Sequence, residues 1–170
     1  MSVPELDRID RKILDILQRQ GRLPMTELAH EVGLSTSPVT ERVRRLERVG
    51  VITGYHARID PAALGRPLLV FVELTLSAKS GELFEKLRDE LLLEPRVLEC
   101  HLVSGRFDYL VKARLAGMGE YRELLAQILK KIPVPAQSNS YVVMEEIKEG
   151  LTLPVEPRTQ PAAPSARRTR

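Results

Sequence analysis

The chain has 170 residues, 43% of them hydrophobic, which is enough for one average domain or two small ones with buried cores. Its longest apolar run, residues 68–72, is far too short to span a bilayer, and its single cysteine excludes an intrachain disulfide. The sequence starts SVPELDRIDRK after the first Met, without an apolar signal segment, so we expect a cytoplasmic protein.

The net charge of +3 is unevenly distributed along the chain. Residues 1–54 contain nine Lys and Arg against eight Asp and Glu, and residues 66–150 contain twelve against thirteen. The last twenty residues contain four against one. The basic balance therefore lies mostly in residues 151–170 and does not by itself indicate a nucleic-acid binder.

The first fifty residues are predicted to form three short helices. Apolar residues recur at helical spacing over 6–20, and Gly21 is placed to end that helix. A second segment starts at Pro24 and closes at Gly33, and Ser35 is a suitable N-cap for a third helix that stops near Gly50. We place a DNA-binding domain at residues 1–54, with a helix-turn-helix at about 25–44.

The spacing within 25–44 carries this prediction. A small residue, Ala29, allows close helix approach, and a glycine, Gly33, suits the left-handed turn between two helices. With Val39, Val43 and Leu46 facing the core, the third helix turns Ser37, Glu41, Arg44 and Arg48 outward, with Arg45 beside them and Arg42 at the edge, where it could brace the helix. An arginine-rich helix alone is more often a solvated charged face, but the preceding motif favours DNA reading.

The remaining chain alternates between strand and helix patterns. Residues 55–67 are predicted to form a linking strand and hinge, and residues 68–150 a second domain. Strands are expected at 68–76, 97–104, 107–115 and 138–146, with a tight turn at 105–106, and helices at 82–93 and 118–132. This β-α-β-β-α-β order predicts a ferredoxin-like fold and, with the helical domain, an α+β protein.

Two further features concern assembly and the chain end. Both faces of the first strand carry apolar residues, whereas two helices cover only one face, so we expect a homodimer. Residues 151–170 are rich in Pro, Ala, Thr and Arg, and we expect a disordered tail there.

Catalytic and metal-binding patterns are weak in this sequence. Cys100 and His101 are neighbours in a strand and point to opposite faces, so they cannot form a nucleophile–base pair. No metal-ligand spacing or phosphate-binding glycine loop is found. We therefore expect neither an enzyme nor a resident cofactor or metal.

Several segments together resemble the Lrp/AsnC family of transcription regulators. These are LDRIDRKIL, ERVRRLERVGVITGY, ECHLVSGRFDYLVKAR and YVVMEE, so the resemblance covers roughly residues 5–150. It implies a winged-helix-like DNA-binding domain and a ferredoxin-like domain that dimerises, assembles dimers into tetramers, octamers or larger rings, and senses amino acids. The residues that would contact DNA are Ser35, Thr36, Ser37, Thr40, Glu41, Arg42, Arg44, Arg45 and Arg48.

The resemblance also implies an effector site around the loop of residues 104–108. The residues that would bind the effector are Leu102, Gly105, Asp108, Met118, Tyr141, Val142 and Val143. Asp108 could pair with an ammonium group, and Gly105 could turn backbone amides toward a carboxylate. Leucine or another apolar amino acid is the expected effector, although Arg106 stands where leucine-responsive members often have an acid. Taken alone, Gly105 and Asp108 could equally serve only the turn.

The expected function is thus a nucleoid-associated, sequence-specific regulator of amino-acid metabolism, an activator or a repressor, acting on double-stranded DNA. Two alternatives stay open at this point. One is an architectural DNA-binding protein without a ligand, and the other is an enzyme like the siroheme decarboxylases, which resemble this two-domain build.

Overall fold

The computed structural model describes residues 4–155, which form two compact units. Unit 1 comprises residues up to 57 together with the segment from 149, and unit 2 comprises residues 58–148. The C-terminal segment joins unit 1 through a pair of hydrogen bonds with α1. The Gln18 side chain donates to the Leu153 carbonyl at 3.1 Å and accepts from the Leu153 amide at 2.7 Å.

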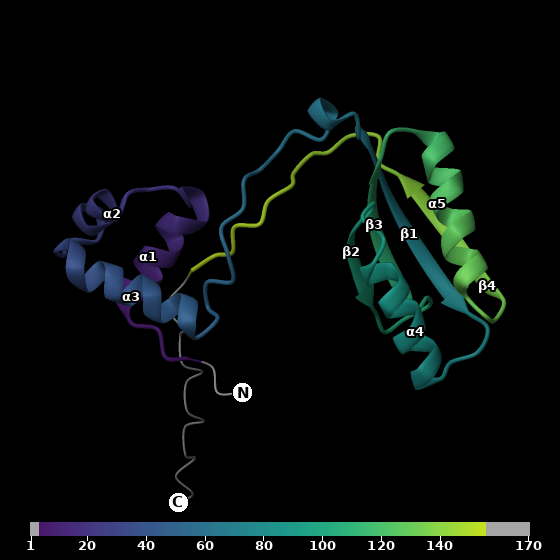
Figure 1. The fold of residues 1–170 in the computed structure, drawn as a ribbon, viewed down its shortest axis with the longest axis horizontal. Coiled ribbons are helices and arrows are strands. Elements are labelled where there is room, and N and C mark those ends of the chain that lie inside the picture. Colours follow the sequence, from purple (N-terminus) through teal and green to yellow (C-terminus); the bar gives the residue numbers. More distant parts are fainter. Residues whose placement is uncertain (1–3, 156–170) are drawn as a thin grey trace, which may run out of the picture. The chain divides into compact units, whose positions relative to one another are not determined.

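Unit 1 contains the three expected helices: α1 (Arg8–Arg19), α2 (Met25–Val32) and α3 (Thr36–Arg48) (Figure 1). Gly33 ends α2 in the left-handed conformation, at a φ of 76°, as the turn between the two helices requires. Val39, Val43 and Leu46 are buried as predicted, and they form the unit 1 core together with Ile13, Leu17, Leu28, Ala29 and Val32. The helix-turn-helix fold is therefore confirmed.

The linking strand predicted after α3 is not formed. Residues 53–60 have no regular structure, and a short 3-10 helix, η1 (Ala62–Leu64), follows. The alternation of apolar residues in this segment predicted an extended strand. A strand also needs a hydrogen-bonded neighbour, and residues 4–155 supply none to this segment.

Unit 2 has the expected ferredoxin-like order. Its elements are β1 (Leu68–Leu76), α4 (Gly81–Leu92), β2 (Val97–Leu102), β3 (Tyr109–Leu115), α5 (Met118–Lys131) and β4 (Ala136–Val142). The four strands pair antiparallel in the order β2-β3-β1-β4. The bounds of β1 agree with the prediction, whereas β4 starts and ends earlier than expected.

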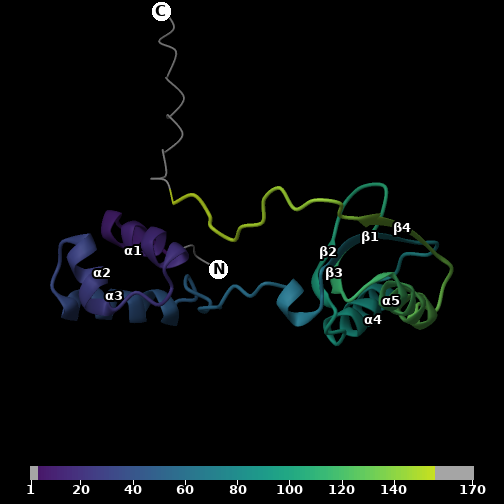
Figure 2. The ribbon, with the colours of Figure 1, turned by 90° about the horizontal axis from the view of Figure 1, so that it is seen from above.

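Helices α4 and α5 lie on one face of this sheet (Figure 2). The apolar residues of β1 and β3 that face them, such as Val70, Leu74 and Leu115, are fully buried. The other face carries a mixed set that includes the partly buried Phe71 and the exposed Tyr141. Large exposed side chains also follow β4, at Met144 and Ile147. The prediction that the helices cover one face only is confirmed.

Candidate nucleic-acid interface and effector residues

Helix α3 presents the outward surface expected of a DNA-reading helix. Opposite buried Val39 and Val43, Ser37 and Arg44 are exposed, and Arg44 has no ion-pair partner among residues 4–155. Arg48 Nη2 lies 3.5 Å from Glu41 Oε1, and the two side chains are 69% and 70% exposed. An ion pair this exposed is worth at most about 1 kcal/mol, so Arg48 can exchange Glu41 for a phosphate easily.

The first turn of α3 leaves most of its polar groups available. Ser35 occupies the N-cap position, as expected, but its side chain makes no capping hydrogen bond. Ser35, Thr36 and Ser37 are all exposed. Thr40 differs, because its hydroxyl donates to the Thr36 carbonyl at 2.8 Å and is partly satisfied within the helix. The N-terminal amides of a helix and its partial positive charge also favour an anion such as a phosphate.

Two of the four α3 arginines point instead toward the start of α1. Arg42 Nη1 lies 2.6 Å from Asp7 Oδ2 and 2.8 Å from Asp10 Oδ1, and Arg45 Nη2 contacts Asp10 Oδ2. Asp10 is only 1% exposed. The suggestion that Arg42 braces the helix is confirmed. Arg45 lies beside the outward set as expected, but its guanidinium is bound to a buried carboxylate, which the sequence did not predict.

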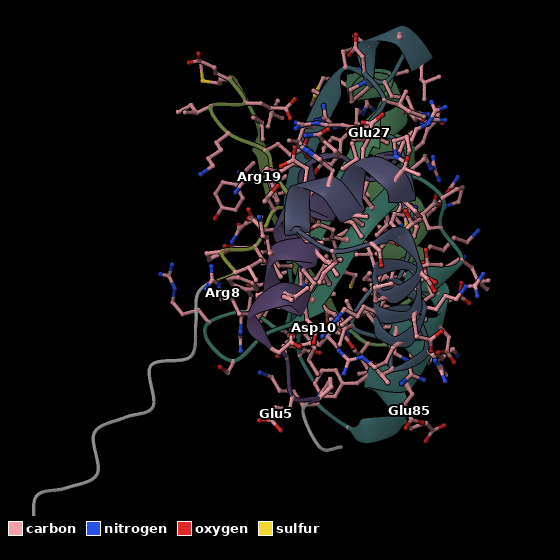
Figure 3. The ribbon with its side chains drawn as sticks, turned by 90° about the vertical axis from the view of Figure 1, so that its left-hand side faces the viewer. Glu5, Arg8, Asp10, Arg19, Glu27 and Glu85 are labelled. Carbon is pink, nitrogen blue, oxygen red and sulfur yellow. The ribbon has the colours of Figure 1, made fainter. Side chains whose placement is uncertain are left out.

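The same two acids form the N-terminal cap of α1. The Asp7 side chain accepts from the Asp10 amide at 2.8 Å, and the Asp10 side chain accepts from the Asp7 amide at 3.2 Å. The Asp10 amide, helped by the guanidinium of Arg42 and opposed by partial burial, lowers the pKa of Asp7. We refer to Asp7, Asp10, Arg42 and Arg45 as the α1–α3 cluster. In Figure 3, Asp10 and Arg8 lie on different sides of α1.

One feature of the sequence indicates that Asp10 is paired, although it does not identify the partners. Asp10 occupies a position in the apolar stripe of α1, one turn before Ile13 and two turns before Leu17. An acid in an apolar stripe is almost never left unpaired when it is buried. Its partners, however, lie on a helix more than thirty residues away and could not be assigned from local spacing.

The residues expected around the effector lie at two ends of the unit 2 sheet. Leu102 pairs with Tyr109, which pairs with Leu74, near one end of β1. Met118 starts α5 just after Leu115, which pairs with Leu68 at the other end. The rise per residue of a strand places Leu74 and Leu68 about 20 Å apart along β1, so Leu102 and Met118 lie near opposite ends of the sheet. Tyr141 pairs with Phe71 and Val142 with Val70, and Val143 follows beside Leu69. A single chain does not gather the whole set into one pocket.

Asp108 is part of a buried network within its own unit. Its carboxylate accepts from the Leu76 amide at 2.8 Å and lies 2.7 Å from Lys79 Nζ, and the residue is 4% exposed. Burial tends to raise the pKa of this carboxyl, but Lys79 and the Leu76 amide outweigh burial and lower it. An effector ammonium would therefore have to compete with Lys79, which sequence analysis did not identify.

The loop between β2 and β3 is longer than the predicted tight turn. It spans residues 103–108 and is closed by a bond from the Val103 amide to the Asp108 carbonyl at 2.9 Å. Gly105 has a φ of 156°, a conformation that side chains rarely adopt, and Arg106 beside it is exposed. Leu102 and Met118 are also exposed, at 61% and 51%.

Two other kinds of feature are absent from residues 4–155, namely metal-binding clusters and membrane-spanning helices. Within residues 4–155, no three His, Cys, Asp or Glu side chains gather in a way that could hold a metal ion. The helices of that same range include none long and apolar enough to cross a membrane.

Both units match families of known proteins. Residues 6–47 match the AsnC-type helix-turn-helix domain, and residues 69–153 match the Lrp/AsnC ligand binding domain. The chain is 47% identical over 154 residues to the leucine-responsive regulatory proteins of Escherichia coli K12 and of Klebsiella pneumoniae. These matches cover 91% of this chain and 94% of each relative.

Solved structures agree with the sequence relatives. An AsnC family regulator from Agrobacterium tumefaciens superposes with a TM-score of 0.84 at 33% identity, covering 88% of this chain and 97% of that one. A transcriptional regulator from Neisseria meningitidis, in complex with L-methionine, gives 0.83 at 31% identity, covering 89% and 97%. A feast or famine regulatory protein from Mycobacterium tuberculosis, also with L-methionine, gives 0.76 at 33% identity, covering 85% and 96%. This chain therefore belongs to the Lrp/AsnC family of DNA-binding transcription regulators.

Proposed function

We propose that α3 enters the major groove of DNA, with Ser37, Arg44 and Arg48 as its principal contacts. The observation that carries this proposal is the exposed Arg44 on the face opposite buried Val39 and Val43, where no residue within 4–155 forms an ion pair with it. Arginine can bind guanine edges with two hydrogen bonds, or phosphates by charge. The secondary contacts are the flanking residues Ser35, Thr36, Thr40 and Glu41. A two-fold symmetric dimer would bind pseudo-palindromic DNA with half-sites about 34 Å apart.

Arg44→Ala and Arg48→Ala test this interface. If either side chain contacts phosphate, its loss flattens the plot of log affinity against log salt by about 0.9 per contact. Arg19→Ala is a matched control, because Arg19 is an exposed arginine on α1 that makes an ion pair with Asp15 at 2.8 Å. Unchanged affinity and slope in both α3 variants would remove them from the interface.

The second part of the proposal is self-association through the open face of the unit 2 sheet. A homodimer covering this face would bury the exposed Tyr141 and the partly buried Phe71 beside it. Dimers would then assemble into tetramers, octamers or larger rings. Sedimentation of the wild type and of Phe71→Glu tests this, since a charge in an apolar interface should shift the chain to smaller species.

The third part concerns the effector, a small apolar amino acid such as leucine. Its contacts are the residues of the predicted set, and the wide separation of Leu102 from Met118 supports a site completed between two copies of the chain. Binding between copies would favour one assembly over another, to the extent that the effector prefers it. Two structural neighbours were solved with L-methionine, so methionine is a second candidate.

A mixing experiment separates a shared site from one within a single chain. Leu102→Glu and Met118→Glu are each expected to abolish the thermal stabilisation that the amino acid gives the wild type. When the two variants are co-expressed, a shared site recovers ligand binding, because one of the two sites in a mixed pair carries neither substitution. A site within one chain always keeps one substitution and recovers nothing. If none of the twenty amino acids stabilises the wild type, the ligand-independent architectural role takes the place of this proposal.

This function places the protein in the cytoplasm, associated with the nucleoid, as a regulator of genes of amino-acid metabolism. Its activity as a regulator needs no cofactor beyond the effector and no catalytic residue.

A further inference from the structure

The arginines of α3 fall into two pairs that differ in their partners. Arg44 and Arg48 lie outward, whereas Arg42 and Arg45 are bound by Asp7 and Asp10 in the α1–α3 cluster. Within the cluster, two carboxylates face two guanidinium groups, so its formal charge is zero. A neutral cluster offers no net attraction to the DNA backbone, although it contains half of the arginines of the helix.

The bound arginines would otherwise be close enough to contact DNA. Arg45 lies one helical turn from Glu41 and from Arg48, two members of the outward set, so it borders the surface assigned to DNA. Its side chain is 45% exposed, and that of Arg42 is 29% exposed. Both guanidinium groups therefore already reach solvent, and within the described part of the chain the carboxylates that offset their charge are Asp7 and Asp10.

Asp10 is the residue that holds this arrangement in place. Its side chain is 1% exposed, its two oxygens are divided between the two arginines, and Oδ2 also accepts the Asp7 amide. Asp7 adds a second carboxylate to Arg42 only, from a side chain that is 51% exposed. The anchoring carboxylate cannot swing away with a side-chain rotation as an exposed acid could, because it is buried in the unit 1 core.

We propose that Asp10, assisted by Asp7, is a positioning residue that withholds Arg42 and Arg45 from DNA phosphates and so limits the affinity of this regulator for DNA of arbitrary sequence. Phosphate contacts supply most of the affinity for nonspecific DNA, whereas contacts to base edges distinguish sequences. Neutralising Arg42 and Arg45 therefore removes phosphate contacts and leaves the contacts to base edges unaffected. The inference rests on the proposal that α3 is the DNA-facing helix.

Asp10→Asn is the decisive variant, because asparagine keeps the shape of the side chain and removes its charge. Releasing the arginines should steepen the slope of log affinity against log salt by about 0.9 for each new phosphate contact, on DNA that lacks a specific site. One added contact changes the affinity ratio of variant to wild type by about threefold between 50 and 200 mM salt.

Asp15→Asn is the matched control. Asp15 lies on the same helix and makes an ion pair with Arg19 at 2.8 Å, so its replacement changes the net charge equally without touching the cluster. Asp7→Asn provides a second test variant that removes a half-exposed acid and releases Arg42 in part, in case Asp10→Asn does not fold. In the Asp10→Asn background, adding Arg42→Gln and Arg45→Gln should restore the wild-type slope.

Each outcome decides the question. A steeper slope in Asp10→Asn or Asp7→Asn, absent in Asp15→Asn and reversed by the glutamine substitutions, supports the proposal. An unchanged slope in the folded variants shows that the cluster is structural only, and a flatter slope shows that the acids present the arginines to DNA; either result overturns it. Arg44→Ala is measured alongside: if it has no effect on binding, the assignment of α3 to DNA has failed, and not merely the role of Asp10.

Discussion

The residues expected to contact DNA lie on one helix and the residue before it, whereas those expected to contact the effector lie on β2, the following loop, α5, β4 and the residue after it. One helix presents its side chains at a fixed angular spacing, so unit 1 can form its surface alone. The unit 2 residues belong to opposite ends of a sheet, so a single chain does not bring them together. The comparison teaches that the first surface depends on local packing within one helix, whereas the second, under the proposal above, depends on assembly.

The largest effects should come from breaking either core, and each should stay within its own unit. Leu46 in unit 1 and Leu124 in unit 2 are both 1% exposed and belong to separate cores. Leu46→Ala and Leu124→Ala should each lower the free energy of unfolding of the affected unit by about 2–5 kcal/mol. Hydrogen exchange resolved by segment measures this, and loss of protection in both units from one substitution would contradict it.

Functional readouts sharpen the same comparison. Leu46→Ala should weaken DNA binding while leaving the sedimentation of the oligomer unchanged. Leu124→Ala should mainly alter self-association and effector binding. Its effect on DNA affinity should be indirect, through any loss of the proposed dimer.

The next effect concerns Asp108, the buried acid of unit 2. Asp108→Asn removes the charge that binds Lys79 and weakens the acceptor for the Leu76 amide, so unit 2 should lose about 1–3 kcal/mol of unfolding free energy. Glu120→Gln is a control, because Glu120 is a less buried carboxylate of the same unit, paired with Arg66 at 3.1 Å. Denaturant unfolding measures both, and equal losses would argue against a special role for Asp108.

The same residue predicts a pH dependence. The pKa of Asp108 in the folded protein lies below its ordinary value of 3.8, because the stabilisation by Lys79 and the Leu76 amide exceeds the cost of burial. Its contribution to stability is therefore complete above about pH 4 and is lost as the pH falls through the folded-state pKa. The wild type and Asp108→Asn should converge in stability under acid conditions. A constant difference between them down to low pH would contradict this.

The same comparison explains how much of the fold and of the candidate sites could be predicted from the sequence. Helical spacing predicted α3 and its buried residues Val39, Val43 and Leu46, and strand alternation predicted β1 to the residue. The partners of Asp10 and Asp108 were not predictable, since ion pairs between distant elements leave no local pattern. The linking strand was wrong because period alone does not supply a neighbouring strand to pair with.

The smallest expected effect concerns the turn between α2 and α3. Gly33 has a φ of 76°, and a Cβ built there would meet no atom within 4 Å, so a substitution acts only through backbone conformation. Gly33→Ala should cost unit 1 about 1–2 kcal/mol, because an L-residue is strained in the left-handed region. Gly33→Asn should recover part of this loss, because asparagine tolerates that region better. Thermal unfolding measures both variants. Equal losses in the alanine and asparagine variants would contradict a cost that is set by the left-handed backbone conformation of residue 33.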